Sequence, residues 1–146
     1  MHVVPCPPTP FWLLLILQIF VTSKISPYEQ GESKAHQACL DIIAKLGLGH
    51  VDLALVHWPG VSKTTPDSDA NSRLRMETWR VMERFYREGK FRAIGVSNYE
   101  ESHLVELLEL ADVPPAVNQF EVHPRRPARS LRKACEDRGG LNHVRY

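Results

Sequence analysis

Apolar residues in this chain follow two different spacings. Short, nearly continuous apolar runs are separated by longer segments in which apolar residues recur every three or four positions. Short apolar runs rich in β-branched residues are typical of strands that are buried in a parallel sheet. The pattern therefore predicts four strands, at residues 20–24, 51–56, 93–97 and 116–122.

The segments that follow these strands have the spacing of amphipathic helices. Helices are predicted at residues 33–46, 74–88, 101–110 and 128–138. The apolar face of the second helix consists of Met76, Trp79, Met82, Phe85 and Tyr86. Gly47 and Gly89 follow the first two helices, and glycine is a frequent helix stop. Residues 60–73 are predicted to form a long polar loop, and loops of this length are often functional.

Strands and helices alternate along the sequence, an order typical of parallel strands joined by right-handed crossovers. No strand is followed by GxGxxG or GxxxxGK[ST], so neither a dinucleotide-binding nor a P-loop fold is indicated. The predicted class is α/β, and the predicted architecture is a partial (β/α)8 TIM barrel. A full barrel needs about 250 residues. The 146 residues of this chain supply about four consecutive βα units.

The two ends of the chain do not fit this repeat. Residues 1–19 are predicted to be a divergent leader, proline-rich and then apolar, and residues 139–146 a divergent tail, which leaves 20–138 as the partial barrel. The apolar run at residues 11–21 is shorter than the roughly 20 residues that span a bilayer. It also lacks the positive charges that precede a secretory signal. A signal or membrane association through this run remains the alternative to a cytoplasmic location.

Composition and charge narrow the possible functions. The net charge of +1 gives no basis for nucleic-acid binding. The odd number of cysteines, all far apart, argues against a disulfide framework and favours a reducing, cytoplasmic compartment. Cys39 and Cys135 fall on apolar faces of predicted helices and are expected to be buried thiols. No spacing of histidines or cysteines indicates a zinc site, so no metal is expected.

Each predicted strand ends in polar side chains, at residues 23–24, 57–58, 97–98 and 119–121. In a barrel, the carboxyl ends of the strands together form the active site. Taken separately, Lys24 fits a solvated loop residue and His57 a structural histidine. Asn98 fits a helix N-cap, and Gln119 fits a partner for loop backbone. Four inward-facing polar groups are costly to bury without a ligand, so together they indicate a binding site.

Four segments carry a resemblance to a known family: residues 20–24 (FVTSK), 51–59 (VDLALVHWP), 89–99 (GKFRAIGVSNY) and 115–124 (PAVNQFEVHP). They resemble the aldo-keto reductase family and occur in its order and at its spacing. The resemblance covers about residues 20–138. It implies a (β/α)8 barrel that binds NADPH, with NADH less favoured. It also implies reduction of a small-molecule aldehyde or ketone to an alcohol. No nucleic-acid partner is expected, and a membrane partner is not favoured.

The resemblance also implies roles for individual residues. Lys24 matches the family's catalytic lysine, whose ammonium group lowers the pKa of a proton-donating tyrosine. His57 matches the histidine that orients the carbonyl oxygen. Trp58 is similar to residues that line the substrate pocket. The groups that hydrogen-bond the nicotinamide carboxamide correspond to Ser97, Asn98 and Gln119.

The chain departs from the family pattern in front of the lysine strand. The family's catalytic aspartate and tyrosine belong to that segment, and residues 1–19 contain neither. The residues that hold the adenosine phosphates belong mainly to a part of the barrel beyond the matched segments. We therefore expect a truncated relative with low or no activity of its own. The alternative is a non-catalytic half-barrel that self-associates through open strand edges or pairs with an intact relative.

Overall fold

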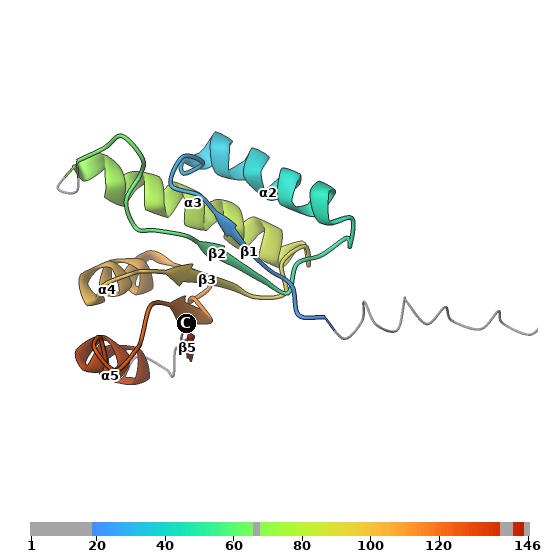
Figure 1. The fold of residues 1–146 in the computed structure, drawn as a ribbon. Coiled ribbons are helices and arrows are strands. Elements are labelled where there is room, and N and C mark those ends of the chain that lie inside the picture. Colours follow the sequence, from blue (N-terminus) through green and yellow to red (C-terminus); the bar gives the residue numbers. More distant parts are fainter. Residues whose placement is uncertain (1–18, 66–67, 138–141, 145–146) are drawn as a thin grey trace, which may run out of the picture.

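The computed structural model describes residues 19–65, 68–137 and, for the backbone only, 142–144 (Figure 1). Its strands are β1 (Thr22–Ile25), β2 (Leu53–Val56), β3 (Ile94–Ser97), β4 (Val117–Gln119) and β5 (Asn142–Val144). Its helices are α2 (Glu32–Leu46), α3 (Asp69–Arg87), α4 (Glu101–Leu110) and α5 (Arg129–Asp137). The predicted alternation of strands and helices is confirmed.

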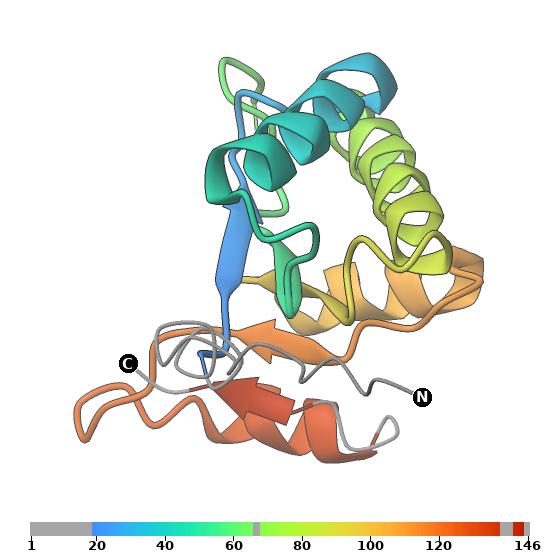
Figure 2. The same cartoon turned by 90° about the vertical axis from the view of Figure 1, so that its right-hand side faces the viewer.

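All strand pairs are parallel, and the sheet keeps the order of the sequence, β1-β2-β3-β4-β5. Such an order arises when successive crossovers pass on the same side of the sheet, as they do in a barrel wall. Figure 2 shows the sheet curving, with the helices arranged along its outer side. The described elements form an arc of a (β/α) barrel, as the sequence predicts.

The main hydrophobic core lies between the sheet and the helices. Val56 and Val96 point toward the helices and pack in one cluster with Trp79 of α3. Leu55 is also fully buried, but it lies outside this cluster. Successive strand residues point to opposite faces, so Leu55 belongs to the inner face of the arc. Cys39 and Cys135 are buried thiols on the helix side, as predicted.

Helix α3 begins earlier than the hydrophobic pattern predicts. It starts at Asp69 rather than at residue 74, and the Ser68 hydroxyl oxygen accepts a hydrogen bond from the Ala70 N–H at 3.3 Å. Its polar first turn carries no apolar periodicity, and the loop after β2 is correspondingly shorter. The prediction that Tyr86 faces the core is wrong, because its side chain is 39% exposed.

The sequence pattern also gave no element after residue 138, whereas β5 pairs in parallel with β4. A strand this short is not detectable from alternation of apolar and polar residues. The boundaries of the leader and tail stay predictions, and most of the apolar run at residues 11–21 lies outside the described residues. Within the part that the structure does describe, no helix is long and apolar enough to cross a bilayer.

Candidate active site

The carboxyl ends of the strands bring the predicted polar residues to one face of the sheet. Lys24 pairs with Leu55 in the register of β1 and β2, and Ser97 pairs with Gln119 in that of β3 and β4. Paired residues of parallel strands point the same way, as do residues two positions apart. Lys24, Leu55 and His57 therefore share the inner face of the arc, opposite the helix-packed core.

Lys24 and His57 interact electrostatically. The pKa of His57 lies below its ordinary value of 6.5, first because the imidazole is partly buried and second because Lys24 is positively charged. Near neutral pH the imidazole is consequently uncharged. A neutral imidazole offers one N–H donor and one acceptor nitrogen. The pair thus places a neutral hydrogen-bonding ring beside a cation.

Asn98 links the ends of three strands. Its backbone N–H donates to the Gln119 carbonyl at 2.9 Å, and its side-chain amide donates to the His57 carbonyl at 3.0 Å and to the Ser97 hydroxyl at 3.1 Å. Its φ of 60° is left-handed, a conformation in which asparagine is enriched. The reading of Asn98 as a helix N-cap is wrong, because Glu100 occupies that position of α4.

Gln119 holds an acceptor without a partner. Its backbone carbonyl accepts from the Ser97 hydroxyl at 2.9 Å, but its side-chain Oε1 is buried and receives no hydrogen bond from any described residue. Leaving a buried acceptor unpaired costs about 1–3 kcal/mol. An N–H donor arriving with a ligand would remove that cost. A primary carboxamide, which carries both N–H donors and an acceptor oxygen, fits this end of the sheet.

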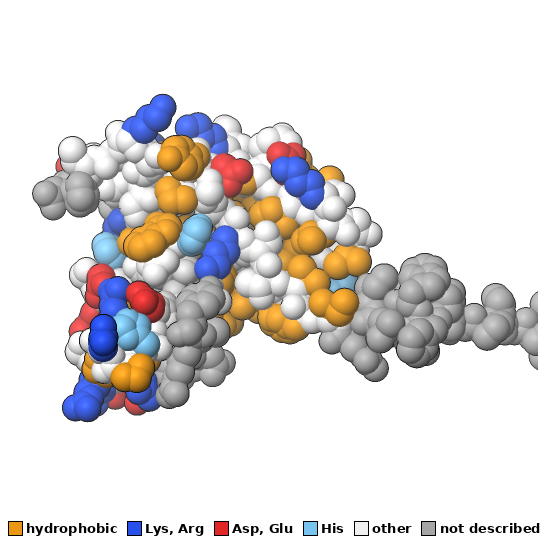
Figure 3. Space-filling view, viewed as in Figure 1, with side chains coloured by type: hydrophobic (Ala, Val, Ile, Leu, Met, Phe, Trp, Pro, Cys, Tyr) orange, Lys and Arg blue, Asp and Glu red, His pale blue; other side chains and the backbone are white. Residues whose placement is uncertain are grey.

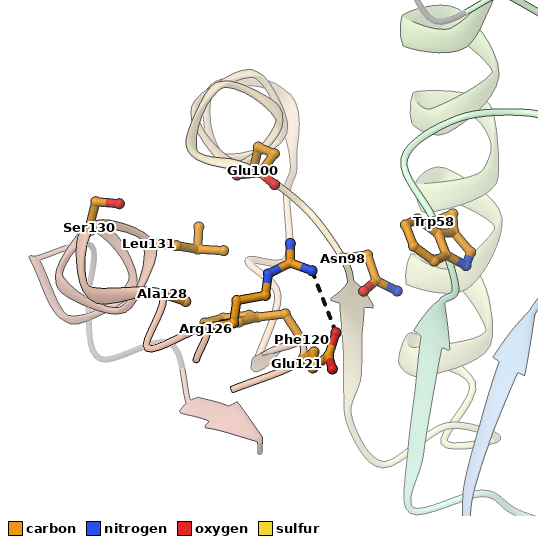
Figure 4. A pocket seen from close by; sticks show the side chains of 9 residues that line it. All are labelled: Trp58, Asn98, Glu100, Phe120, Glu121, Arg126, Ala128, Ser130 and Leu131. Carbon is orange, nitrogen blue, oxygen red and sulfur yellow. Dashed lines mark hydrogen bonds and ion pairs between the residues drawn. The ribbon is translucent and has the colours of Figure 1, made fainter. Parts of the chain in front are cut away.

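Trp58 is 48% exposed, and its ring centroid lies 6.2 Å from that of His57. Together with Asn98 and Phe120 it lines a cavity of about 370 Å³ (Figure 4). The opposite wall comes from α5 and the segment before it, where Arg126 forms an ion pair with Glu121 at 3.5 Å. Neither Lys24 nor His57 lines this cavity. It adjoins the Lys24–His57 pair across Trp58.

One feature of this region was not anticipated from sequence. Arg126 reaches the cavity from a segment that the pattern treats only as the approach to a helix, and no motif marks it. Within residues 19–65 and 68–137, no three histidine, cysteine or acidic side chains are grouped to hold an ion.

Comparison with known proteins decides the family. The sequence model described as "Aldo/keto reductase family" matches residues 17–146. The chain belongs to the aldo/keto reductase family. The match includes residues 139–146, which the hydrophobic pattern left outside the barrel.

Several family members are close in sequence and fold. Glyoxal reductase of Bacillus subtilis is 40% identical over 122 residues, which cover 84% of this chain and 40% of the relative. The solved aldose reductase of Giardia lamblia superposes with a TM-score of 0.76 at 33% identity, over 88% of this chain and 45% of that one. An aldo-keto reductase of the silkworm Bombyx mori, complexed with NADPH, gives a TM-score of 0.75 at 31% identity, over 88% of this chain and 38% of that chain.

The chain spans less than half the length of these aldo-keto reductases. Its described residues match their barrel fold, and a nicotinamide cofactor is bound in the silkworm relative. The individual roles stay predictions for Lys24, His57, Trp58, Ser97, Asn98 and Gln119. The structure brings these residues to one end of the sheet.

Proposed function

We propose that this chain carries the carbonyl-orienting and nicotinamide-binding part of an NADPH-dependent aldehyde or ketone reductase. The observation that carries the proposal is the buried, unpartnered Oε1 of Gln119 beside Asn98. It lies on the same face of the sheet as the Lys24–His57 pair. A carboxamide acceptor site next to a neutral imidazole and a cation suits hydride transfer to a polarised carbonyl.

NADPH, when bound, supplies the hydride. Gln119 Oε1 would accept a hydrogen bond from the carboxamide nitrogen of the cofactor and so fix which face of the nicotinamide ring meets the substrate. The side-chain N–H groups of Asn98 already donate hydrogen bonds to the His57 carbonyl and the Ser97 hydroxyl. Its contribution would be to hold the ends of β2, β3 and β4 in register around the ring.

His57 and Lys24 would act on the substrate oxygen. The neutral imidazole donates a hydrogen bond to the carbonyl oxygen, and the ammonium charge stabilises the negative charge that develops there. Tyr99 does not serve as the proton donor at this point, because it is buried in the helix-side core and burial raises its pKa. We therefore expect the isolated chain to turn over little or no substrate.

The first test is direct. The purified chain of 146 residues, mixed with NADPH and glyoxal, is expected to show no measurable loss of NADPH absorbance. The physical reason is that losing a general acid alone lowers rates by about 10²–10⁴. Turnover that disappears on Lys24→Ala would contradict this expectation.

The second test isolates the site. Residues 20–138 replace the matching segment of Bacillus subtilis glyoxal reductase, so that the relative supplies the rest of the barrel. The chimera is expected to reduce glyoxal with NADPH. Lys24→Met or His57→Gln should lower kcat/KM by about 10²-fold or more, as removal of a charge-stabilising group does. Lys34→Met, an exposed lysine on α2, is the matched control and should leave the rate unchanged. An active chimera that tolerates both site substitutions would refute the proposed roles.

A second candidate function rests on a different observation. Ile19 and Phe20, just before β1, are 60% and 68% exposed, and among the described strands β1 is an outer strand of the sheet. Figure 3 shows hydrophobic side chains gathered in this region, beside the grey atoms. A half-barrel of this kind would act through self-association or by pairing with an intact relative.

We also propose a reducing, cytoplasmic compartment. The support is that Cys39 and Cys135 are buried as thiols, and that burial raises the pKa of Cys39 to about 12. A thiol with so high a pKa stays protonated and unreactive near neutral pH. Microscopy of a fluorescent fusion at the carboxyl terminus checks the compartment, and a secreted product would contradict it.

A further inference from the structure

Four consecutive backbone carbonyls after β2 each accept a hydrogen bond from a side chain of another element. These carbonyls belong to residues 57–60, the segment that carries His57 and Trp58. The donors are Asn98 to His57 at 3.0 Å, Gln30 to Trp58 at 2.8 Å and to Gly60 at 3.0 Å, and Arg75 to Pro59 at 3.1 Å. The His57 N–H continues the ladder to the Ile25 carbonyl of β1 at 3.0 Å, and the four carbonyls of the segment are held by these side chains.

Gln30, in the turn between β1 and α2, hydrogen-bonds this segment. Its amide nitrogen bridges the carbonyls of Trp58 and Gly60, two residues apart, and so fixes the bend at Pro59. The side chain is 2% exposed. Its Oε1 is buried and accepts nothing from the described residues, so the amide is oriented by the two carbonyls alone. Burial of both ends leaves little room for another rotamer.

Arg75 of α3 holds the same segment from the other side. One guanidinium nitrogen donates to the Pro59 carbonyl and another pairs with Glu106 of α4. The Ser72 hydroxyl also hydrogen-bonds Glu106. The positive charge of Arg75 is thus balanced by Glu106 within the protein. The buried guanidinium connects α3 and α4 to the segment after β2.

We infer that Gln30 and Arg75 are positioning residues for the Trp58 indole and, through it, for the substrate. The inference rests on the proposed function, because it takes Trp58 to line the substrate pocket. Gln30 grips the carbonyl of Trp58 itself, so its loss lets the ring move without breaking the Lys24–His57 pair. The expected kinetic effect is on KM more than on kcat, and it is larger for a bulky aromatic aldehyde than for glyoxal.

The decisive experiment uses the whole chain without cofactor, labelled with 5-fluorotryptophan. Fluorine NMR reports on the three tryptophans, and Trp58→Phe assigns the Trp58 signal. Gln30→Met removes the two hydrogen bonds at similar volume and is expected to shift or broaden the Trp58 signal. The Trp79 signal, from a buried ring whose N–H donates to the Val113 carbonyl at 3.1 Å, should stay in place and report an intact core.

Gln37→Met is the matched control, because this exposed amide on α2 lies away from the segment after β2 and donates a hydrogen bond to the carboxylate of Asp41, at 2.8 Å. It should leave the Trp58 signal where it was. An unmoved Trp58 signal in a folded Gln30→Met chain would overturn the inference. If Gln30→Met fails to fold, Arg75→Lys gives the second measurement. The lysine keeps the charge beside Glu106 but loses the fork, and a Trp58 signal that does not respond to it overturns the inference equally.

The kinetic arm uses the chimera with glyoxal reductase. Gln30→Met should raise KM for benzaldehyde by roughly two- to tenfold, the free-energy range of one hydrogen bond, with kcat changed by less than about twofold. An inactive chimera whose Trp58 signal still responds to Gln30→Met would refute the proposed function and leave the positioning contact standing. Equal losses of kcat for both aldehydes would refute the positioning role.

Discussion

At the scale of single residues, the inner face of the sheet combines a cation with a neutral base. The depressed pKa of His57 follows from partial burial and from Lys24. A histidine that resists protonation in the folded chain, but not in the unfolded chain, makes stability depend on pH. The unfolded chain binds more protons just below pH 6.5, so folding is weakened there as the pH falls.

This direction of the pH dependence of stability gives a prediction for His57→Gln. The native chain should lose stability as the pH drops from 7 toward about 5, a window in which the carboxylates remain ionised. In His57→Gln the loss should be smaller, and the remainder should come from His103, whose pKa is lowered mainly by burial. Urea midpoints measured at several pH values check this. An unchanged pH dependence in the variant would show that His57 titrates normally.

Asp52 is a second residue whose environment the structure defines, at the opposite end of β2 from His57. Its carboxylate accepts the Val21 N–H at 2.9 Å and an Arg92 nitrogen at 2.8 Å. These contacts, chiefly the Val21 N–H, lower the pKa of Asp52. The placement at the amino ends of the strands indicates a structural role and not a catalytic one.

Asp52→Ala should therefore lower the free energy of unfolding without changing the Lys24–His57 site. The expected loss is about 1–3 kcal/mol, because the variant leaves the Val21 N–H without its acceptor. The Arg92 side chain is 62% exposed, so the loss of its ion pair adds little. Asp137→Ala, which removes an exposed pair with Lys133, is the control and should leave the urea midpoint close to that of the unsubstituted chain. Urea unfolding measures both. Equal losses would mean that the Asp52 contacts add little.

At the scale of elements, the spacing of apolar residues predicted the strands and helices that have buried faces. It missed the helix start that is set by a polar cap. The strand at residues 51–56 was found because both of its faces are buried, and the helix at 33–46 because one of its faces is covered. The polar start of α3 was missed because Ser68 and not an apolar residue fixes it. Strand β5 was missed because three residues show no period.

The contact between β3 and β4 is close enough to depend on a glycine. A Cβ at Gly95 would lie 2.6 Å from the Val117 carbonyl oxygen and 2.8 Å from a methyl group of Leu55. The carbonyl belongs to the backbone of the next strand and cannot move aside without loosening the sheet. Leu55 fills the inner face over the glycine.

Gly95→Ala should consequently destabilise the chain by about 1–3 kcal/mol, the usual cost of overpacking. Gly60→Ala is the matched control, since nothing lies within 4 Å of a Cβ built there. Thermal melting followed by circular dichroism compares the two. A Gly95→Ala chain as stable as the control would mean that β3 and β4 separate at little cost.

At the scale of the whole molecule, the arc has a filled outer side and an inner side that carries the candidate chemistry. One general rule, that barrels place their chemistry at the carboxyl ends of strands, predicted the shared face of Lys24 and His57. The positioning roles of Gln30 and Arg75 could not be predicted from the sequence. Their partners are backbone carbonyls, which every sequence has, and only the fold brings them within reach.

Self-association is the property that belongs to this scale. Phe20→Glu should shift an associated chain toward monomer, because it places a charge beside the exposed Ile19, just before β1. Tyr28→Glu, at a side chain that is equally exposed, is the control for charge alone. Sedimentation velocity over a range of concentrations separates the species. A compact monomer in the unsubstituted chain would contradict the half-barrel pairing.

The sequential strand order also has a consequence for how the chain folds. Each strand pairs with the strands that precede and follow it in the sequence, as Lys24 does with Leu55 and Val96 with Asn118. The segments that must close before each pairing are therefore about 20 to 40 residues long, and none of them has to span a further strand of the sheet. Strands β1 and β2 with α2 can assemble while later residues are still being synthesised. We expect a chain that folds progressively from its amino-terminal side, as each new strand finds its neighbour already in place.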